Sequence, residues 1–245
     1  MRLKDKVALI TGGSGDIGGV TAVKFAQEGA KIVVHYHKNI AKADKVVKNI
    51  KEIGGEAISY MADVSNRDDV KRMCDAAVDQ FGTIDILINY AGIPRDALLY
   101  KMTEEQWDEV IDVNLKGSFN CAQFASIPMV KQNYGRIINI ASGAIKGQPG
   151  QANYAAAKSG LIGLTKTLAL ELAKFNIIVN LIVVGIIETE VIKNITPEMK
   201  QEMINRNAFK RLGKPIEIAN VALFLASDEC TFITGQIIDA RGGVR

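Results

Sequence analysis

A glycine-rich segment near the start of the chain limits the folds that are open to it. Residues 11–19 read TGGSGDIGG and stand between an apolar run at 6–10 (KVALI) and a helical pattern at 20–28. A short continuous apolar run is typical of a strand that is buried on both faces of a parallel sheet. Glycines between such a strand and a helix let backbone amides approach a pyrophosphate at the helix N-terminus. The segment therefore predicts an α/β fold that binds a nucleotide.

Apolar runs and helical patterns continue to alternate along the chain. We expect further strands at 31–35, 57–61, 84–89, 135–141, 177–184 and 236–239, and helices at 41–53, from 66 or 68 to 81, from 103, from 151, at 192–207 and at 214–226. This alternation predicts a parallel sheet with right-handed crossovers. Because no linker or repeat interrupts it, we expect residues 1–245 to form one doubly wound α/β sandwich domain, with a seven-stranded parallel sheet and helices on both faces.

Charge and apolar patterning argue against nucleic acid and membranes as partners. The formal net charge is +3, and the lysines are scattered along predicted helices rather than grouped in runs. The most apolar stretch, 177–187, is half of the about 20 residues that a membrane span needs. The N-terminus lacks a secretory signal pattern. Cys74, Cys121 and Cys230 are far apart and form no C-x-x-C, as expected of buried thiols in a reducing compartment. We therefore expect a soluble, cytoplasmic protein.

The end of the second predicted strand bears on the choice of cofactor. An acidic residue at this place binds the ribose 2′-hydroxyl of NAD, whereas basic residues suit the 2′-phosphate of NADP. The chain has Tyr36, His37 and Lys38 here and no acid, which favours NADP(H), with NAD(H) as the alternative. His35 and His37 could also be read as metal ligands, but no third ligand is near in sequence, so we expect no metal.

Residues 151–160 (QANYAAAKSG) place a tyrosine and a lysine four positions apart on one face of a predicted helix. Such a pair usually lies on the surface, but of the six tyrosines only Tyr154 is followed by a lysine, Lys158, at this spacing. A free phenol has a pKa of about 10, and a fixed ammonium beside it favours the phenolate. We expect Lys158 to lower the pKa of Tyr154 toward neutrality for acid–base chemistry. Ser142, at the end of the preceding strand, could hold a substrate oxygen.

The motifs together resemble a known family. The glycine-rich turn is followed by N-x-A-G at 89–92, by Asn114, by Ser142 and by Y-x-x-x-K at 154–158. In this order they resemble the short-chain dehydrogenase/reductase family over essentially the whole chain. Within it the chain is most similar to the 3-oxoacyl-acyl-carrier-protein reductases, through segments such as MTEEQWDEVIDVNLKGSFN, GRIINIAS and LASDECTFITGQ. The resemblance implies a Rossmann-type fold and a homotetramer that pairs through two long helices and the C-terminal strand.

The resemblance also implies roles for individual residues. Asn114, Ser142, Tyr154 and Lys158 would form a catalytic tetrad, in which Tyr154 protonates a carbonyl oxygen held by Ser142 while NADPH delivers hydride. Lys158 would grip the nicotinamide ribose, and Asn114 would hold a water that replaces the proton. The residues implied for cofactor binding are Gly12, Ser14, Gly15, Asp16, Ile17, Gly18, His37, Lys38, Asp63, Val64, Asn89, Ala91, Gly92, Tyr154, Lys158, Gly185, Ile187 and Thr189.

The chain departs from the family pattern at five places on the cofactor side. Asp16 replaces a glycine of the turn T-G-x-x-x-G-x-G, where its carboxylate would repel a pyrophosphate or cap the helix in its place. Tyr90 replaces the second asparagine of N-N-A-G and adds bulk beside the cofactor, and Val184 replaces the proline of a P-G. Ser142 is one residue closer to the catalytic tyrosine than is usual in this subfamily, and Arg241 stands where Asp usually precedes the C-terminal glycine pair.

Three functions are consistent with these observations. The first is an NADPH-dependent reductase of 3-oxoacyl thioesters, for which Lys131 and Lys174 would help to dock an acidic carrier protein. The second is a dehydrogenase for a sugar, a steroid or a cyclic alcohol. The third is a non-catalytic oligomer subunit with impaired cofactor binding, suggested by Asp16. Gly15 stands where NADPH-dependent members often carry a basic residue, which weakens the case for NADP. The complete tetrad favours an enzyme.

Overall fold

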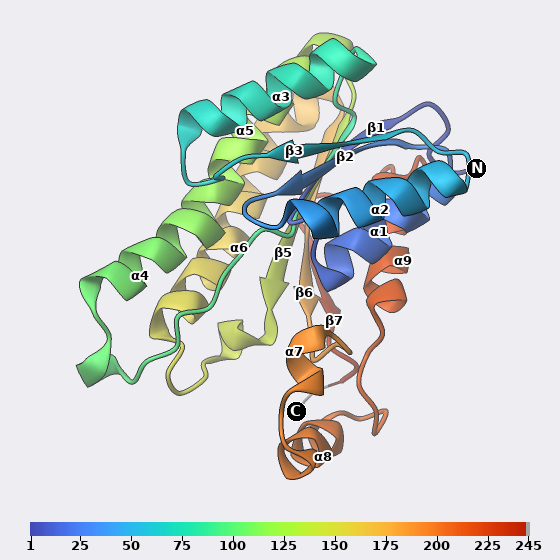
Figure 1. Cartoon of the computed structure of the whole chain (residues 1–245). Helices are drawn as coiled ribbons and strands as arrows, with labels where there is room; N and C mark the ends of the chain where they lie inside the picture. Colours follow the sequence, from blue (N-terminus) through green and yellow to red (C-terminus); the bar gives the residue numbers. More distant parts are fainter. Residues whose placement is uncertain (244–245) are drawn as a thin grey trace.

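The computed structural model describes residues 1–243, apart from the side chains at positions 191 and 193. Within that range seven strands form one sheet in the order β3-β2-β1-β4-β5-β6-β7, and each adjacent pair is parallel (Figure 1). The strands are β1 (Val7–Thr11), β2 (Lys31–Tyr36), β3 (Ala57–Met61), β4 (Ile86–Asn89), β5 (Gly135–Ser142), β6 (Ile177–Val184) and β7 (Ile237–Ala240). The strand order reverses between β1 and β4, which confirms the predicted doubly wound parallel sheet.

Helices cover both faces of the sheet (Figure 1). One face packs against α1 (Asp16–Gln27), α2 (Ile40–Glu52) and α9 (Pro215–Ala226). The other packs against α3 (Arg67–Phe81), α5 (Gly117–Gln132) and α6 (Ala152–Leu172), while α4 (Glu104–Ile111) packs against α6. The short helices α7 (Glu190–Lys193) and α8 (Pro197–Arg206) lie beyond the end of β6, where the sequence predicts one polar helical stretch.

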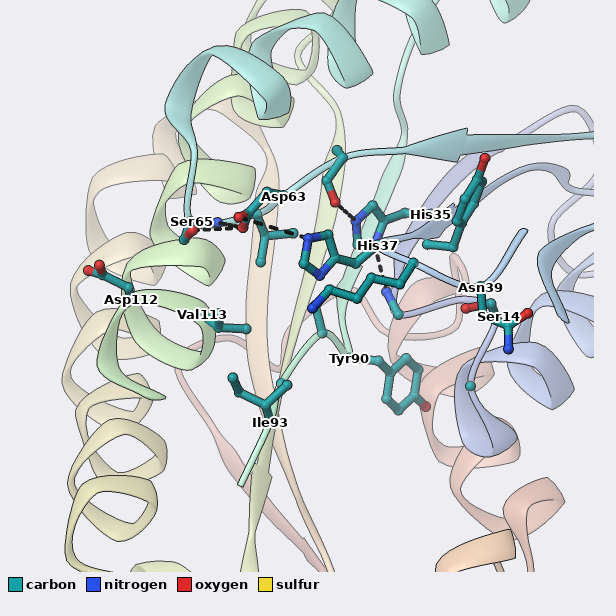
Figure 2. A pocket seen from close by; sticks show the side chains of 18 of the residues that line it. Ser14, His35, His37, Asn39, Asp63, Ser65, Tyr90, Ile93, Asp112 and Val113 are labelled. Atoms are coloured by element: carbon teal, nitrogen blue, oxygen red, sulfur yellow. Dashed lines mark hydrogen bonds and ion pairs between the residues drawn. The ribbon is translucent and has the colours of Figure 1, made fainter. Parts of the chain in front are cut away.

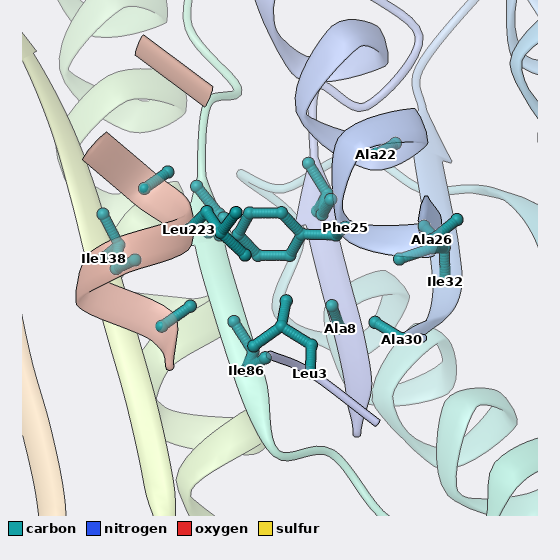
Figure 3. Close-up of a cluster of buried hydrophobic side chains, with 14 of the residues drawn as sticks. Leu3, Ala8, Ala22, Phe25, Ala26, Ala30, Ile32, Ile86, Ile138 and Leu223 are labelled. Carbon is teal, nitrogen blue, oxygen red and sulfur yellow. The ribbon is translucent and has the colours of Figure 1, made fainter. Parts of the chain in front are cut away.

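The central strands are apolar because both of their faces are covered. All five residues of β1 are buried, and they alternate between two cores: Ala8 and Ile10 belong to one, whereas Leu9 belongs to the other. On the first face Phe25 of α1 is fully buried in the same cluster as Leu223 of α9 (Figure 3). Truncation of a buried phenylalanine to alanine typically costs about 3–5 kcal/mol, so this contact fixes α1, and with it the glycine-rich turn, on the sheet.

Two helices differ from the sequence prediction. The first begins at Asp16 rather than at position 20, because Gly18 and Gly19 lie inside its first turns instead of before it. The helix expected from position 103 begins with the predicted cap, a capping box between Thr103 and Gln106, but a π-helical turn (η2, Asp112–Lys116) separates α4 from α5. Asn114 lies in this turn, and π-turns inside α-helices are frequent at functional sites.

The described residues contain no helix that is both long enough and apolar enough to pass through a lipid bilayer.

Candidate active site

The glycine-rich turn brings backbone very close to backbone. Gly12 has φ +62°, and an ideal Cβ on it would lie 3.0 Å from the amide nitrogen of Ala91. A Cβ on Gly18 would lie 2.3 Å from the carbonyl oxygen of Gly12, so only glycine fits. Gly15 is the N-cap of α1 and makes no side-chain cap, which leaves the first-turn amides of the helix available for an anion. This cradle fits the pyrophosphate of a dinucleotide.

A cavity of about 640 Å³ lies beside this turn, beyond the carboxyl ends of β1, β2, β3 and β4 (Figure 2). In doubly wound sheets this crevice, where the strand order reverses, is the place where ligands bind. The cavity brings together nine of the residues that the sequence analysis assigns to the cofactor: Gly12, Ser14, Gly15, His37, Lys38, Asp63, Val64, Ala91 and Gly92.

The side of the cavity at which the sequence prediction places the adenine is built around Asp63. Its Oδ1 accepts hydrogen bonds from the backbone amide (2.9 Å) and the hydroxyl (2.7 Å) of Ser65, and its Oδ2 lies 4.0 Å from Nε2 of His37 (Figure 2). Burial acts to raise the pKa of Asp63, but the two Ser65 hydrogen bonds and the nearby histidines outweigh it, so the pKa is lowered and Asp63 is ionised at neutral pH.

At the other end of the cavity, Gly92 touches two members of the expected tetrad. An ideal Cβ on Gly92 would lie 2.4 Å from Oδ1 of Asn114 and 3.2 Å from Nζ of Lys158, so any larger residue would displace them. Asn114 donates through Nδ2 to the carbonyl oxygens of Ile93 and Val110, each at 2.9 Å. Its Oδ1 is buried and has no hydrogen-bond partner among the described residues. A buried acceptor without a partner, aimed at this end of the cavity, is available to hold a ligand or a water.

Lys158 is held inside the protein by the sheet. It is buried, and its Nζ donates to the carbonyl oxygen of Ile140 at 3.0 Å and lies 5.7 Å from the centre of the Tyr154 ring. Burial lowers the pKa of Lys158 to about 8. The ammonium form therefore still predominates at neutral pH, but the pKa lies close enough to neutrality for the group to exchange a proton.

The pKa of Tyr154 differs from the expectation. Burial raises it, a hydrogen-bonding interaction with Ser142 lowers it, and the charge of Asp96 raises it, with an increase as the net result. Lys158 is not among the groups that shift this pKa, and its ammonium donates to the Ile140 carbonyl. The expectation that the pKa of Tyr154 is lowered is therefore wrong. The interaction with Ser142 nevertheless shows that the shortened spacing keeps the serine beside the phenol.

Several predicted cofactor residues lie elsewhere. Asp16 lines a separate groove between α1 and α2, and Asn89 is buried in the sheet, where Nδ2 donates to Asn139 at 2.9 Å. Gly185 and Ile187 line a small cavity of about 180 Å³ next to Arg241. The remaining assigned positions, Ile17, Gly18, Tyr154, Lys158 and Thr189, are not among the residues that line the main cavity.

The structure shows what the departures from the family pattern do. Asp16 does not cap α1, contrary to one expectation; its Oδ2 accepts from the backbone amide of Glu190 at 2.6 Å. Tyr90 lines the main cavity, but its hydroxyl is buried and hydrogen bonds with Thr21 of α1 (3.1 Å), so much of its bulk serves to anchor that helix.

Arg241, the departure near the C-terminus, is buried and pairs with Asp239, and its side chain packs beside Gly143. Val184 is buried at the end of β6, where it pairs with Ser142 of β5 and Ala240 of β7.

The sequence analysis did not assign several residues that line the cavity, notably His35, Asn39, Ser65, Ile93 and Val113. Ser65, Ile93 and Val113 adjoin assigned motifs, so their proximity in sequence was an available signal. His35 was considered only as a metal ligand. Both of its ring nitrogens are hydrogen bonded within the protein, to Gly12 and Ala62, and neither is available to a metal.

The fold and this crevice define the class of dinucleotide-binding α/β proteins. A family model described as enoyl-(acyl carrier protein) reductase matches residues 13–245. A protein of Thermotoga maritima named 3-oxoacyl-(acyl-carrier-protein) reductase FabG is 46% identical over 100% of this chain and 99% of its own length. A protein of the same name from Staphylococcus aureus is 46% identical over 98% of this chain and 98% of its own length. A solved short-chain dehydrogenase/reductase of Serratia marcescens, a double mutant, superposes with a TM-score of 0.95 at 31% identity, over 100% of this chain and 99% of its own. The chain belongs to the short-chain dehydrogenase/reductase family.

Proposed function

We propose that the chain is an NADPH-dependent reductase that converts a 3-oxoacyl thioester, carried on an acyl carrier protein, to the 3-hydroxyacyl form. The observation that carries the proposal is the contact of Gly92 with both Asn114 and Lys158, because it joins the expected tetrad to the end of the nucleotide cavity. The names of the FabG relatives, at 46% identity over nearly full length, support the substrate class.

The roles proposed for the tetrad follow from chemistry and placement. A bound nicotinamide supplies or accepts the hydride. Tyr154 donates its phenolic proton to the carbonyl oxygen, and Ser142, beside that phenol, orients the same oxygen. The ammonium of Lys158 binds the ribose hydroxyls, and the partnerless Oδ1 of Asn114 accepts from a water that reprotonates the tyrosine through the lysine. Burial keeps the phenol protonated, which suits a proton donor in the reducing direction.

We propose NADP(H) as the cofactor, with NAD(H) as the weaker alternative. His37 and Lys38 line the cavity at the end of β2 and provide basic side chains for a 2′-phosphate. Asp63 lies 4.0 Å from His37, and this distance supports a role for the pair in positioning the adenosine.

Large apolar side chains on the surface support a homotetramer that pairs through α5, α6 and the C-terminal strand. Leu170 of α6 is 83% exposed, and Phe232, shortly before β7, is fully exposed. Ile127 and Phe119 of α5 are also exposed. Lys131 and Lys174, near the ends of α5 and α6, would contact an acidic carrier protein, and the buried free thiols are consistent with a cytoplasmic location.

The test is consumption of NADPH with a 3-oxoacyl thioester, measured by the loss of reduced-nicotinamide absorbance. Reduction that is faster with the carrier-bound than with the free thioester supports the proposal. Turnover of only a sugar, steroid or cyclic ketone would favour the second function, and the absence of binding of NADPH and NADH would favour the non-catalytic subunit. Tyr154→Phe serves as the matched control for background reduction.

A further inference from the structure

His35 joins two segments that both line the cavity. It lies in β2, is 2% exposed, and is next to Tyr60 of β3 in the sheet register. The backbone amide of Gly12 donates to Nδ1 of His35 at 2.9 Å, and Nε2 makes a hydrogen bond of 3.0 Å with the carbonyl oxygen of Ala62 (Figure 2). Because the Gly12 amide can only donate, Nδ1 carries no proton, and Nε2 is the donor to Ala62. The hydrogen bonds therefore define the neutral imidazole with its proton on Nε2.

The two segments that this ring connects have different tasks in a dinucleotide site. Gly12 begins the turn that approaches the pyrophosphate. It has a φ of +62°, and its backbone amide donates the hydrogen bond to His35. Ala62 directly precedes Asp63 and Val64, which line the adenine side of the cavity. A single rigid ring thus sets the distance between the phosphate-binding and the adenine-binding parts. A long flexible side chain could not do so.

We propose that neutral His35 is a positioning residue of the cofactor site, which clamps the glycine turn to the adenine-side loop and releases them when it is protonated. The inference rests on the NADP(H) binding proposed above and goes beyond it, since His35 itself is not among the residues expected to touch the cofactor. Protonation would place an N–H of the ring against the N–H of Gly12, so the hydrogen bond would be replaced by a repulsive contact.

The surroundings of His35 keep it neutral at ordinary pH. Its pKa is lowered to about 4, chiefly by burial and to a smaller extent by the charge of His37. The hydrogen bond to Ala62 and the charge of Asp63 act to raise the pKa but are outweighed. The clamp is thus intact near neutrality and opens only in acid.

The experiment compares NADP⁺ binding by the full chain and its variants, measured by calorimetry at pH 7.5. His35→Asn places an acceptor oxygen near the position of Nδ1 for the Gly12 amide, without a titrating nitrogen, but is too short to reach Ala62, whereas His35→Leu offers neither hydrogen bond. We expect the dissociation constant to stay within about threefold in His35→Asn and to rise about tenfold or more in His35→Leu, as for two lost hydrogen bonds. In steady state, the KM for NADPH should rise with little change in kcat.

A second readout does not depend on a variant that folds. The chain contains only two histidines, so the ring signals of His35 and His37 can be followed separately by NMR. Saturating NADP⁺ should move the titration midpoint of His35 to lower pH, because the cofactor binds the neutral form better.

Either of two results would overturn the role of His35 alone: unchanged NADP⁺ affinity in a folded His35→Leu, or a His35 titration that NADP⁺ does not move. A histidine with only a structural role would give both results, and His35→Leu would then differ from the wild type only by a lower melting temperature. A wild-type chain that binds neither NADP⁺ nor NADPH would overturn the proposed function together with this inference. A chain that binds the cofactor but shows either of the two results above would overturn only the role of His35.

Discussion

The carboxylate of Asp16 accepts a hydrogen bond of 2.6 Å from the backbone amide of Glu190, 174 positions later in the chain. Glu190 in turn forms an ion pair of 2.5 Å with Lys42 of α2. The start of α7 is therefore attached to the N-terminal ends of α1 and α2, directly beside the glycine-rich turn. An acidic residue in the first turn of α1 is favourable for the helix, but it brings negative charge to the entrance of an anion site.

We expect Asp16→Gly to tighten NADP(H) binding about fivefold, because a like charge near the pyrophosphate is removed, an effect of about 1 kcal/mol for a partly exposed pair. Fluorescence titration with NADPH measures it. Asp16→Asn is the matched control, since it removes the charge but keeps an acceptor for the Glu190 amide, and it should reproduce most of the gain. Unchanged dissociation constants in both variants would show that the carboxylate does not act on the cofactor.

Tyr154→Phe should lower kcat by about 10²–10⁴-fold, the usual contribution of a positioned general acid. Cofactor affinity should change little, because Lys158 keeps its hydrogen bond to the Ile140 carbonyl. Parallel measurement of NADPH consumption and NADPH binding separates the two effects. A variant that retains more than a small fraction of the wild-type rate would exclude Tyr154 as the proton donor.

Lys158 should make the folded chain less stable near neutrality. Its pKa falls from 10.5 to about 8 on burial, so between these values the unfolded chain binds more protons, and stability rises with pH across this window. Below about pH 8 the whole cost applies, up to about 3 kcal/mol. Lys158→Met should therefore be inactive yet about 1–3 kcal/mol more stable at pH 7 in urea denaturation. This advantage should shrink between pH 8 and 10.5; an advantage independent of pH would contradict the explanation.

His35 should contribute to acid denaturation. Its folded-state pKa of about 4 lies below the ordinary value of 6.5, so the unfolded chain takes up the proton first and stability falls as the pH drops from 6.5 toward 4. The loss from this group amounts to about 3 kcal/mol. His35→Asn should show a flatter dependence of the unfolding free energy on pH in this range. Parallel curves for wild type and variant would count against a buried neutral imidazole.

Substitution of exposed apolar residues by charged ones should dissociate the proposed tetramer into dimers. Leu170→Glu on α6 and Phe232→Asp near β7 should each convert the tetramer to dimers, because each places a charge in one of two different apolar interfaces. Light scattering after size exclusion measures the mass. Met61→Glu is the control, because Met61 is 63% exposed at the end of an edge strand, outside both surfaces. A wild-type chain that elutes as a monomer would refute the assembly itself.

Elements with a local period could be predicted closely from the sequence. The predicted strands at 57–61 and 177–184 have the same bounds as β3 and β6, since each is a short apolar or β-branched run with clear limits. The first helix was placed four residues late, because the propensity of Gly18 and Gly19 argued against helix there. Tertiary packing, not helix propensity, requires glycine at this point of the helix, because the carbonyl oxygen of Gly12 leaves no room for a Cβ at Gly18.

What the sequence determined alone was whatever depends on neighbours a few positions apart: the alternation of strands and helices, the glycine-rich turn, and the four-residue spacing that stacks Tyr154 and Lys158. Contacts between distant segments were decided only in the folded chain. Asp16 with Glu190, and His35 between Gly12 and Ala62, depend on which strand ends become neighbours in the sheet. The same holds for the direction of the Lys158 ammonium, which follows the nearest buried carbonyl rather than the helix face on which the lysine lies.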